Sequence, residues 1–145
     1  MKILPILLLG SLLTTVASAD NLSLPKQEAP IRYNSNATFS AYTLCGDFVA
    51  TEEADNKTSN GNSKEDVQNH IQQLNTLMSP YFVRNQKGQI YPPALTYLIF
   101  GTSDICNKNP SIKLIDSIHQ VAYNLAKIVE KANNETKSDI KTNRH

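Results

Sequence analysis

The side chains of this chain that could do chemistry are two cysteines, three histidines and scattered carboxylates. Neither Cys45 nor Cys106 belongs to a Cys-x-x-Cys pair, and neither stands at a zinc-like spacing from His70, His119 or His145. A catalytic thiol or a metal-ligating cysteine therefore has little support. The favoured interpretation is one structural disulfide between Cys45 and Cys106.

No catalytic motif joins the remaining reactive groups. The chain has no Gly-x-Ser-x-Gly elbow, no phosphate-binding glycine loop and no His-Glu-x-x-His helix. His70 is expected at the border of a helical apolar stripe without a visible partner, and Asp47, Asp104 and Asp116 are isolated acids. The acidic loop at residues 51–62 lacks the EF-hand order of oxygen donors. The sequence predicts a protein that is not an enzyme and uses neither a metal nor a cofactor.

The first residues predict a secretory signal peptide at residues 1–19. A positive charge near the start precedes an apolar run, and residues 17–19 form a small-x-small cleavage site. The run is short for a membrane span and contains Pro5 and Gly10, so no membrane association is expected after cleavage. An oxidising compartment favours the disulfide, and closing a loop of about 60 residues would contribute roughly 4 kcal/mol of stability.

Charge excludes one class of partner and indicates a response to acid. The chain has 14 basic and 13 acidic side chains, and removal of Lys2 with the signal peptide makes the two numbers equal. No basic stripe marks a nucleic-acid-binding surface. In strong acid the carboxylates become neutral and the three histidines become charged. The resulting net positive charge would loosen the folded state by self-repulsion.

Hydrophobic periodicity predicts four helices within a domain at residues 38–133. Caps, prolines and glycines place them at Thr38–Val49, Ser63–Pro80, Pro92–Gly101 and Pro110–Ala132. The third is apolar nearly all round and is expected to be the central buried element. Residues 81–91 fit a small hairpin or an irregular connection equally well.

The predicted fold class is therefore all-α, a small single-domain helical bundle of about four helices with one disulfide. Residues 20–37 are rich in Pro, Asn, Ser and Gln, and they are expected to form a flexible leader. Residues 134–145 lose the apolar period and are expected to form a flexible C-terminal tail.

The segments around the two cysteines resemble a known family. The sequence CGDFVA at residues 45–50, on an early helix, and ICNKNPSIKL at residues 105–114 are similar to segments of the HdeA/HdeB family of periplasmic acid-stress chaperones. Members of that family are small exported helical proteins. They have a Cys-x-Asp/Glu-Phe helix start and a single disulfide, and a Lys/Asn-rich stretch and a last helix follow their second cysteine.

The resemblance implies an acid-activated holdase that acts in the periplasm. A folded dimer would hide its apolar surface near neutral pH, and acid would dissociate or loosen it so that it holds unfolding clients in solution. The Cys45–Cys106 disulfide would keep the loosened state from unravelling. The implied client-binding positions are Phe48, Val49, Leu95, Leu98, Ile99 and Phe100. An ordinary hydrophobic core is the alternative role for each of them.

A second class of function stays open. A small exported binding protein, such as a periplasmic immunity protein that blocks a toxin or a secreted factor, would also be helical and disulfide-bonded. Such a protein would bind one specific partner tightly at neutral pH, whereas a holdase would bind unrelated clients only in acid. Both interpretations allow a homodimer, and secretion beyond the periplasm also stays open.

Overall fold

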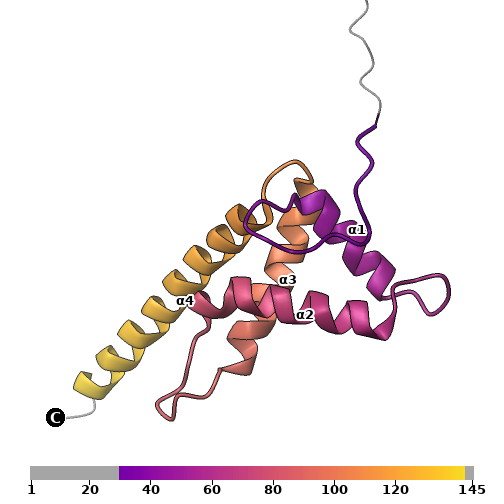
Figure 1. Ribbon diagram of the computed structural model, residues 1–145. Coiled ribbons are helices and arrows are strands. Elements are labelled where there is room, and N and C mark those ends of the chain that lie inside the picture. The colour runs from indigo at the N-terminus through magenta and orange to yellow at the C-terminus, as the bar shows by residue number, and fades with distance from the viewer. Residues whose placement is uncertain (1–29, 143–145) are drawn as a thin grey trace, which may run out of the picture. The chain divides into compact units, whose positions relative to one another are not determined.

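The computed structural model describes residues 30–142, and side chains are described as far as residue 138. The chain divides into two units, residues 1–32 and residues 33–145, and all of the helices described below belong to the second. They are α1 (Cys45–Asp55), α2 (Lys64–Met78), the short 3-10 helix η2 (Ser79–Tyr81), α3 (Pro92–Lys108) and α4 (Leu114–Thr142) (Figure 1). The described residues form no β-strand, so the predicted all-α bundle of four helices is confirmed.

The core of the bundle is the packing of α3 against α4. A short connection joins the two helices, and the buried residues of α3 recur every four positions at Ala94, Leu98, Thr102 and Cys106. Leu114, Ile118, Val121 and Leu125 form the matching stripe on α4. This is the stripe that the periodicity predicted.

Gly101 is not the end of a helix, as the sequence had suggested, because α3 continues to Lys108. The absence of a side chain serves close packing instead. A Cβ atom at position 101 would lie 2.8 Å from Cγ1 of Val121 on α4. Glycine here lets the two helix backbones approach.

The first helix begins at Cys45, seven residues later than the predicted cap at Thr38. Residues 40–44 form a turn and an isolated bridge, in which Leu44 pairs with Lys113. The backbone N–H groups of Cys45 and Gly46 donate to the carbonyls of Ile112 and Pro110, both at 2.8 Å. The α3–α4 connection thus satisfies donors of the first turn of α1, which has no side-chain cap.

The predicted disulfide is present. The Sγ atoms of Cys45 and Cys106 are 2.04 Å apart and join the first turn of α1 to the last turns of α3. Both cysteines have no exposed surface, and Phe48, one turn further along α1, is equally buried. The covalent link therefore lies inside the apolar core.

The second helix begins as predicted, and most of its predicted apolar stripe packs inward: Met78 lies in the core, with Leu74 and Leu77 packed against it. Ser63 and Asp66 form a capping box at its N-terminus. The buried residues of α2 are His70 and Met78, whereas Ile71, expected in the buried stripe, is 54% exposed. Gln73, on the same helix, accepts a hydrogen bond from the backbone N–H of Phe39 at 2.8 Å.

The connection between η2 and α3 combines the two structures considered for residues 81–91. Arg84 and Ile90 form a single antiparallel bridge, and Gly88 turns the chain with φ of +77°. The backbone N–H of Tyr91 donates to the carbonyl of Val83 at 2.8 Å. The segment is therefore hairpin-like in its path without forming a strand pair.

Described structure continues past both predicted ends of the helical domain at residues 38–133. The expected leader, residues 20–37, makes specific contacts by Asn34, whose N–H donates to Asp47 on α1 at 2.6 Å and whose carbonyl accepts from Thr51 at 3.3 Å. At the other end, α4 continues to Thr142 through most of the expected tail. Helix propensity and i,i+4 pairs such as Lys131–Glu135 extend it beyond the apolar stripe. The signal peptide and residues 20–29 lie outside the described residues.

The packing of Gly101 against Val121 makes a testable prediction. Gly101→Ala should lower the free energy of unfolding by about 1 kcal/mol, because the clash with a stiff, buried valine exceeds the gain in helix propensity. In a Val121→Ala background the clash is gone, and the same substitution should raise stability by up to about 1 kcal/mol. Urea denaturation of the four variants measures both effects. A stabilising effect of Gly101→Ala in both backgrounds would contradict the close-packing explanation.

Candidate functional site

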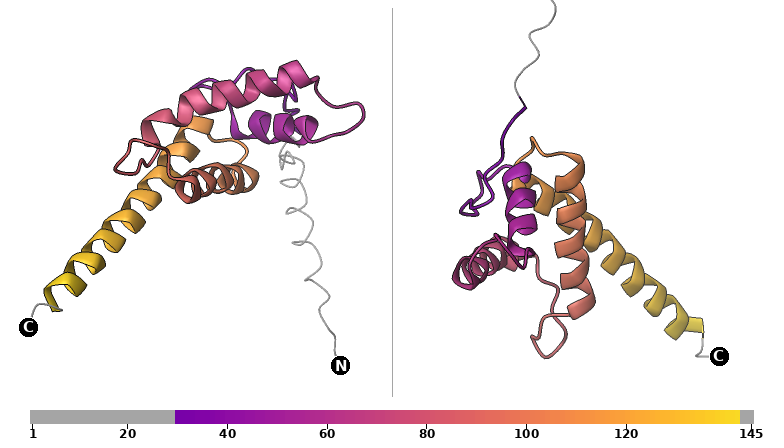
Figure 2. Two further views of the ribbon diagram at one scale, coloured as in Figure 1. Left: turned by 90° about the horizontal axis from the view of Figure 1, so that it is seen from below. Right: turned by 90° about the vertical axis from the view of Figure 1, so that its right-hand side faces the viewer.

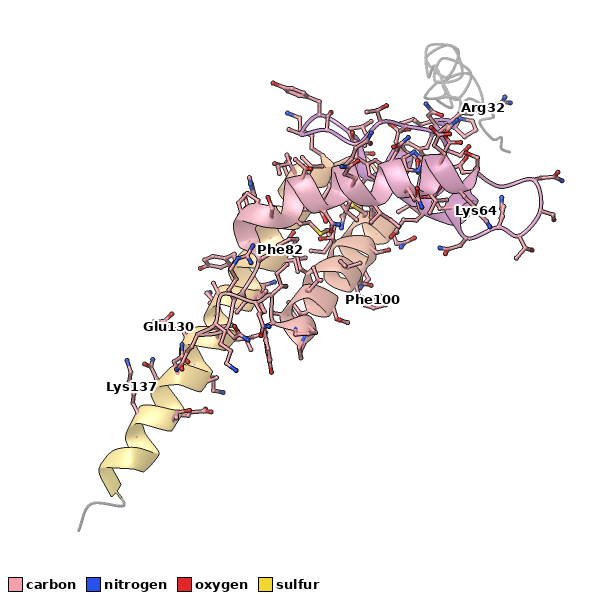
Figure 3. All side chains as sticks on the ribbon, turned by 60° about the horizontal axis from the view of Figure 1, so that its bottom comes forward. Arg32, Lys64, Phe82, Phe100, Glu130 and Lys137 are labelled. Carbon is pink, nitrogen blue, oxygen red and sulfur yellow. A yellow bond between two sulfur atoms is a disulfide. The ribbon has the colours of Figure 1, made fainter. Side chains whose placement is uncertain are left out.

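The structure separates the six predicted client-binding positions into three groups. Phe48 on α1 and Leu98 on α3 are fully buried. Val49, Leu95 and Ile99 are half-buried, and Phe100 is 71% exposed (Figure 3). In the folded state the six side chains therefore do not form one accessible surface. The segment at residues 92–100 is also not uniformly buried, although its composition predicted a central buried helix.

The buried His70 has a partner that the sequence did not reveal. Its Nδ1 atom lies 3.0 Å and 3.1 Å from the two carboxylate oxygens of Asp55, in the last turn of α1. His70 is only 6% exposed, and its ring packs against Phe39 with centroids 5.2 Å apart. The pair ties α2 to α1. No pattern in the sequence signalled this contact, because only the packing of α2 on α1 brings the two residues together.

A second carboxylate lies beside this pair. Glu52 is half-buried on α1, and its Oε2 atom accepts a hydrogen bond from the Ser103 hydroxyl of α3 at 2.7 Å. Burial raises the pKa of Glu52 above its usual value of about 4.5, and the nearby charge of Asp55 adds to the rise, while the Ser103 hydrogen bond opposes it. Glu52 therefore links α1 to α3 and takes up a proton more readily than an exposed glutamate.

The three titratable groups surround a small cavity between α1 and α2. Its volume is about 180 Å³, and its lining includes Glu52, Asp55 and His70 together with Phe39 and Phe48. No serine or cysteine nucleophile lines the cavity. Within the described part of the chain, no cluster of three His, Cys, Asp or Glu residues is placed to hold a metal ion. The arrangement can bind and release protons in a mostly apolar setting.

A third titratable contact lies at the N-terminus of α2. The Ser63 hydroxyl donates to the Asp66 carboxylate at 2.6 Å, and the backbone N–H of Ser63 donates to it as well. The hydroxyl bond is the main cause that lowers the pKa of Asp66, and the backbone bond and the charge of His70 add to it. Asp66 thus stabilises the start of α2 as an anion.

The two pKa shifts have opposite signs, so the cap of α2 and the Glu52 contact between α1 and α3 respond differently to pH. A lowered pKa means that the contribution of Asp66 is present above the usual pKa of about 3.8 and is lost as the pH falls. A raised pKa means that the contribution of Glu52 is present in acid and is lost as the pH rises through that pKa. Acid therefore weakens the capping of α2, whereas it favours Glu52 in its place between α1 and α3.

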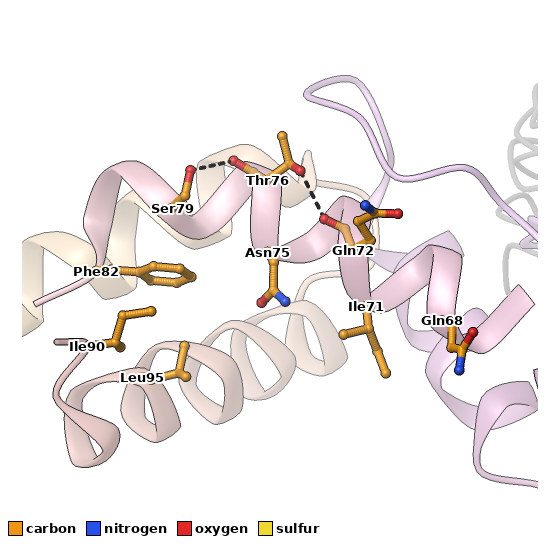
Figure 4. A pocket seen from close by; sticks show the side chains of 9 residues that line it. All are labelled: Gln68, Ile71, Gln72, Asn75, Thr76, Ser79, Phe82, Ile90 and Leu95. Carbon is orange, nitrogen blue, oxygen red and sulfur yellow. Dashed lines mark hydrogen bonds between the residues drawn. The ribbon is translucent and has the colours of Figure 1, made fainter. Parts of the chain in front are cut away.

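An open groove lies on the other side of α2, between that helix, the 82–91 connection and the start of α3 (Figure 4). Its volume is about 580 Å³. Its lining consists of Gln68, Ile71, Gln72, Asn75, Thr76, Ser79, Phe82, Ile90 and Leu95. Among these, sequence reasoning had singled out only Leu95 as a binding residue. The amide side chains of α2 gave no functional signal in the sequence, since exposed amides occur on most helices.

Comparisons with protein-family models, with curated proteins and with solved structures gave no match. The resemblance to the HdeA/HdeB family therefore rests on residues 45–50 and 105–114. None of the helices within the described residues is both long enough and apolar enough to span a membrane.

The raised pKa of Glu52 predicts an unusual pH dependence for one substitution. Glu52→Gln keeps a hydrogen-bond acceptor for Ser103 and makes the uncharged form permanent, so it should raise the melting temperature at pH 7 and leave it nearly unchanged in acid. Differential scanning calorimetry across the pH range measures this. Glu53→Gln, at an exposed neighbouring position, is the matched control and should have no such effect. A destabilising effect of Glu52→Gln at pH 7 would contradict the assignment.

The buried contact between His70 and Asp55 predicts a loss of stability for a second substitution. Asp55→Asn removes the negative partner of His70 and should lower the free energy of unfolding at pH 7 by about 1 to 3 kcal/mol. Asp104→Asn is the control, because Asp104 pairs only with the exposed Lys108 and should cost less than about 1 kcal/mol. Equal losses for both variants at pH 7 would count against a special role for the pair.

Proposed function

We propose that this protein is an acid-activated holdase chaperone of the periplasm, which binds unfolding proteins through apolar surface. One observation carries the proposal: the start of α2 depends on the carboxylate of Asp66, whose contribution is lost in acid, whereas the Cys45–Cys106 disulfide ties α1 to α3 covalently. The resemblance of residues 45–50 and 105–114 to the HdeA/HdeB family supports the same conclusion. The signal-peptide pattern and the disulfide are consistent with export.

The acid step begins at the contacts of α2. Asp55 and His70 form a polar contact at a position where His70 is only 6% exposed, so part of the junction between α1 and α2 is a buried polar pair. Protonation of Asp66 removes the anionic side of the capping box at the start of the same helix. The loss of carboxylate charge throughout the chain adds repulsion between the remaining positive groups. These effects act together to loosen α2.

Loosening of α2 would join the separate apolar groups into one surface. The cavity beside α2 is lined by Phe48, so this side chain becomes accessible when the helix moves. The disulfide keeps α1 next to α3, where Leu98 and Ile99 lie in or against the same core. Glu52 in its uncharged form can still bond to Ser103 and strengthen that junction. The product is a partly open state with a stable scaffold and an exposed apolar face.

The alternative function, a module that binds one specific protein, draws on a different observation. Phe100 is 71% exposed and Tyr97 is 41% exposed in the folded state, without any acid-driven opening. Exposed aromatic side chains of this kind are enriched where proteins bind partners. This function would require tight binding at neutral pH.

The deciding experiment follows the aggregation of an unrelated acid-sensitive enzyme at about pH 2.5, with and without the purified protein, by light scattering. Suppression should occur in acid and be absent at pH 7. The Asp55→Asn variant should begin to suppress aggregation at a higher pH than the unmodified protein, and the Asp104→Asn control should not. Size-exclusion chromatography over the same pH range reports dissociation or expansion.

Absence of suppression in acid, with an unchanged near-ultraviolet circular dichroism spectrum, would overturn the proposal and favour the specific binding module.

Replacement of both cysteines by serine should abolish the suppression of aggregation, because the opened chain would then lack its covalent tie. Full activity of that double variant, with clients held equally well, would show that the disulfide has no part in the open state.

A further inference from the structure

The groove between α2 and α3 has a lining without charge. None of its nine lining residues is ionisable, although nearly a fifth of the chain consists of charged residues. One wall carries amides and hydroxyls of α2, and the other is apolar. Electrostatic complementarity therefore excludes a strongly charged occupant and favours a neutral one.

Three amides of the polar wall, those of Gln68, Gln72 and Asn75, make no hydrogen bond to another described residue. The hydroxyls of Thr76 and Ser79 already donate to backbone carbonyls of α2, at 2.9 Å and 3.0 Å. Gln68 and Asn75, in contrast, point from α2 toward the space beside α3 (Figure 4). Each primary amide supplies both a donor and an acceptor, which is what a peptide backbone requires.

The spacing of these amides fits an extended chain. Gln68 and Asn75 are seven residues apart on a helix, so they stand about 10 Å apart along its axis. Three residues of extended chain cover about the same length, and the N–H of the first and the C=O of the third point to the same edge. A strand lying in the groove could therefore bond to both amides.

The apolar wall completes the site. Ile71 lies between the two amides on α2 and is 54% exposed, and Phe82, Ile90 and Leu95 are half-buried around the other end of the groove (Figure 4). In an extended chain alternate side chains point to one face. Apolar side chains of a bound segment would enter between Ile71 and Leu95 while its backbone faces the amides.

We propose that this groove binds an extended, uncharged peptide segment of an unfolded protein, with Gln68 and Asn75 bonding its backbone and Ile71 and Leu95 receiving its apolar side chains. The source of the segment rests on the proposed holdase function, whereas the chemistry of the groove does not. The groove extends toward the end of α2 that Met78 anchors in the core. The capping contact of Asp66 lies at the other end of α2.

Fluorescence anisotropy with the full-length purified protein at pH 7 tests the site. The probe is a labelled nonapeptide that alternates serine with leucine or phenylalanine, and the control probe carries glutamate in place of serine. The first should bind and the second should not.

Asn75→Ala should weaken binding about fivefold, the effect of one hydrogen bond. Ile71→Lys should abolish binding, because it places a charge in the groove. The matched control Asn69→Ala, on α2 outside the groove, should bind as the unmodified protein does.

The outcomes separate this inference from the proposed function. If the serine-containing peptide does not bind, or binds Ile71→Lys as well as the unmodified protein, the inference is overturned even where aggregation is suppressed in acid. If the chain is a dimer that Ile71→Lys dissociates, a second copy occupies the groove and the inference is equally overturned. If the peptide binds as expected and no suppression occurs in acid, the groove stands and the holdase function fails. Far-ultraviolet circular dichroism checks that each variant is folded, and Asn75→Ala, an exposed position, carries the test if Ile71→Lys loses helix.

Discussion

The buried disulfide between Cys45 and Cys106 is the constraint on which the rest of the structure depends. It joins the start of α1 to the end of α3 inside the core, and the α3–α4 connection supplies carbonyl groups to the first turn of α1 at the same place. A covalent bond and these backbone hydrogen bonds do not depend on protonation. One end of the bundle therefore keeps its arrangement across conditions that change every carboxylate in the chain.

The attachment of α2 combines the apolar contact of Met78 with the core and polar contacts nearer its start. Its inner face places a polar histidine, His70, against Asp55, and its N-terminus depends on the carboxylate of Asp66. A buried polar pair contributes specificity and little net stability, and it becomes costly when one partner changes charge. The junction of α1 and α3 thus includes a covalent bond, whereas the start of α2 depends on a carboxylate whose contribution is lost in acid.

The two sides of α2 also divide its chemistry. The side toward α1 carries groups that titrate, and the side toward α3 carries amides and apolar groups whose binding properties do not change with pH. Figure 2 shows α2 lying across both α1 and α3. Ile71 lines both the cavity beside α1 and the groove beside α3, so the two surfaces are neighbours on the helix.

The sequence by itself determined the all-α class, the disulfide, the cap of α2 at Ser63 and the apolar stripe of α4, because these follow from local spacing and from the number of cysteines. Tertiary structure alone decided the role of Gly101, since only the neighbouring Val121 shows that a glycine is needed for close approach rather than for a helix end. It also decided the partner of His70 and the exposure of Ile71 on α2. Contacts between distant segments depend on how helices turn about their axes as they pack, and a local pattern in one helix does not contain that information.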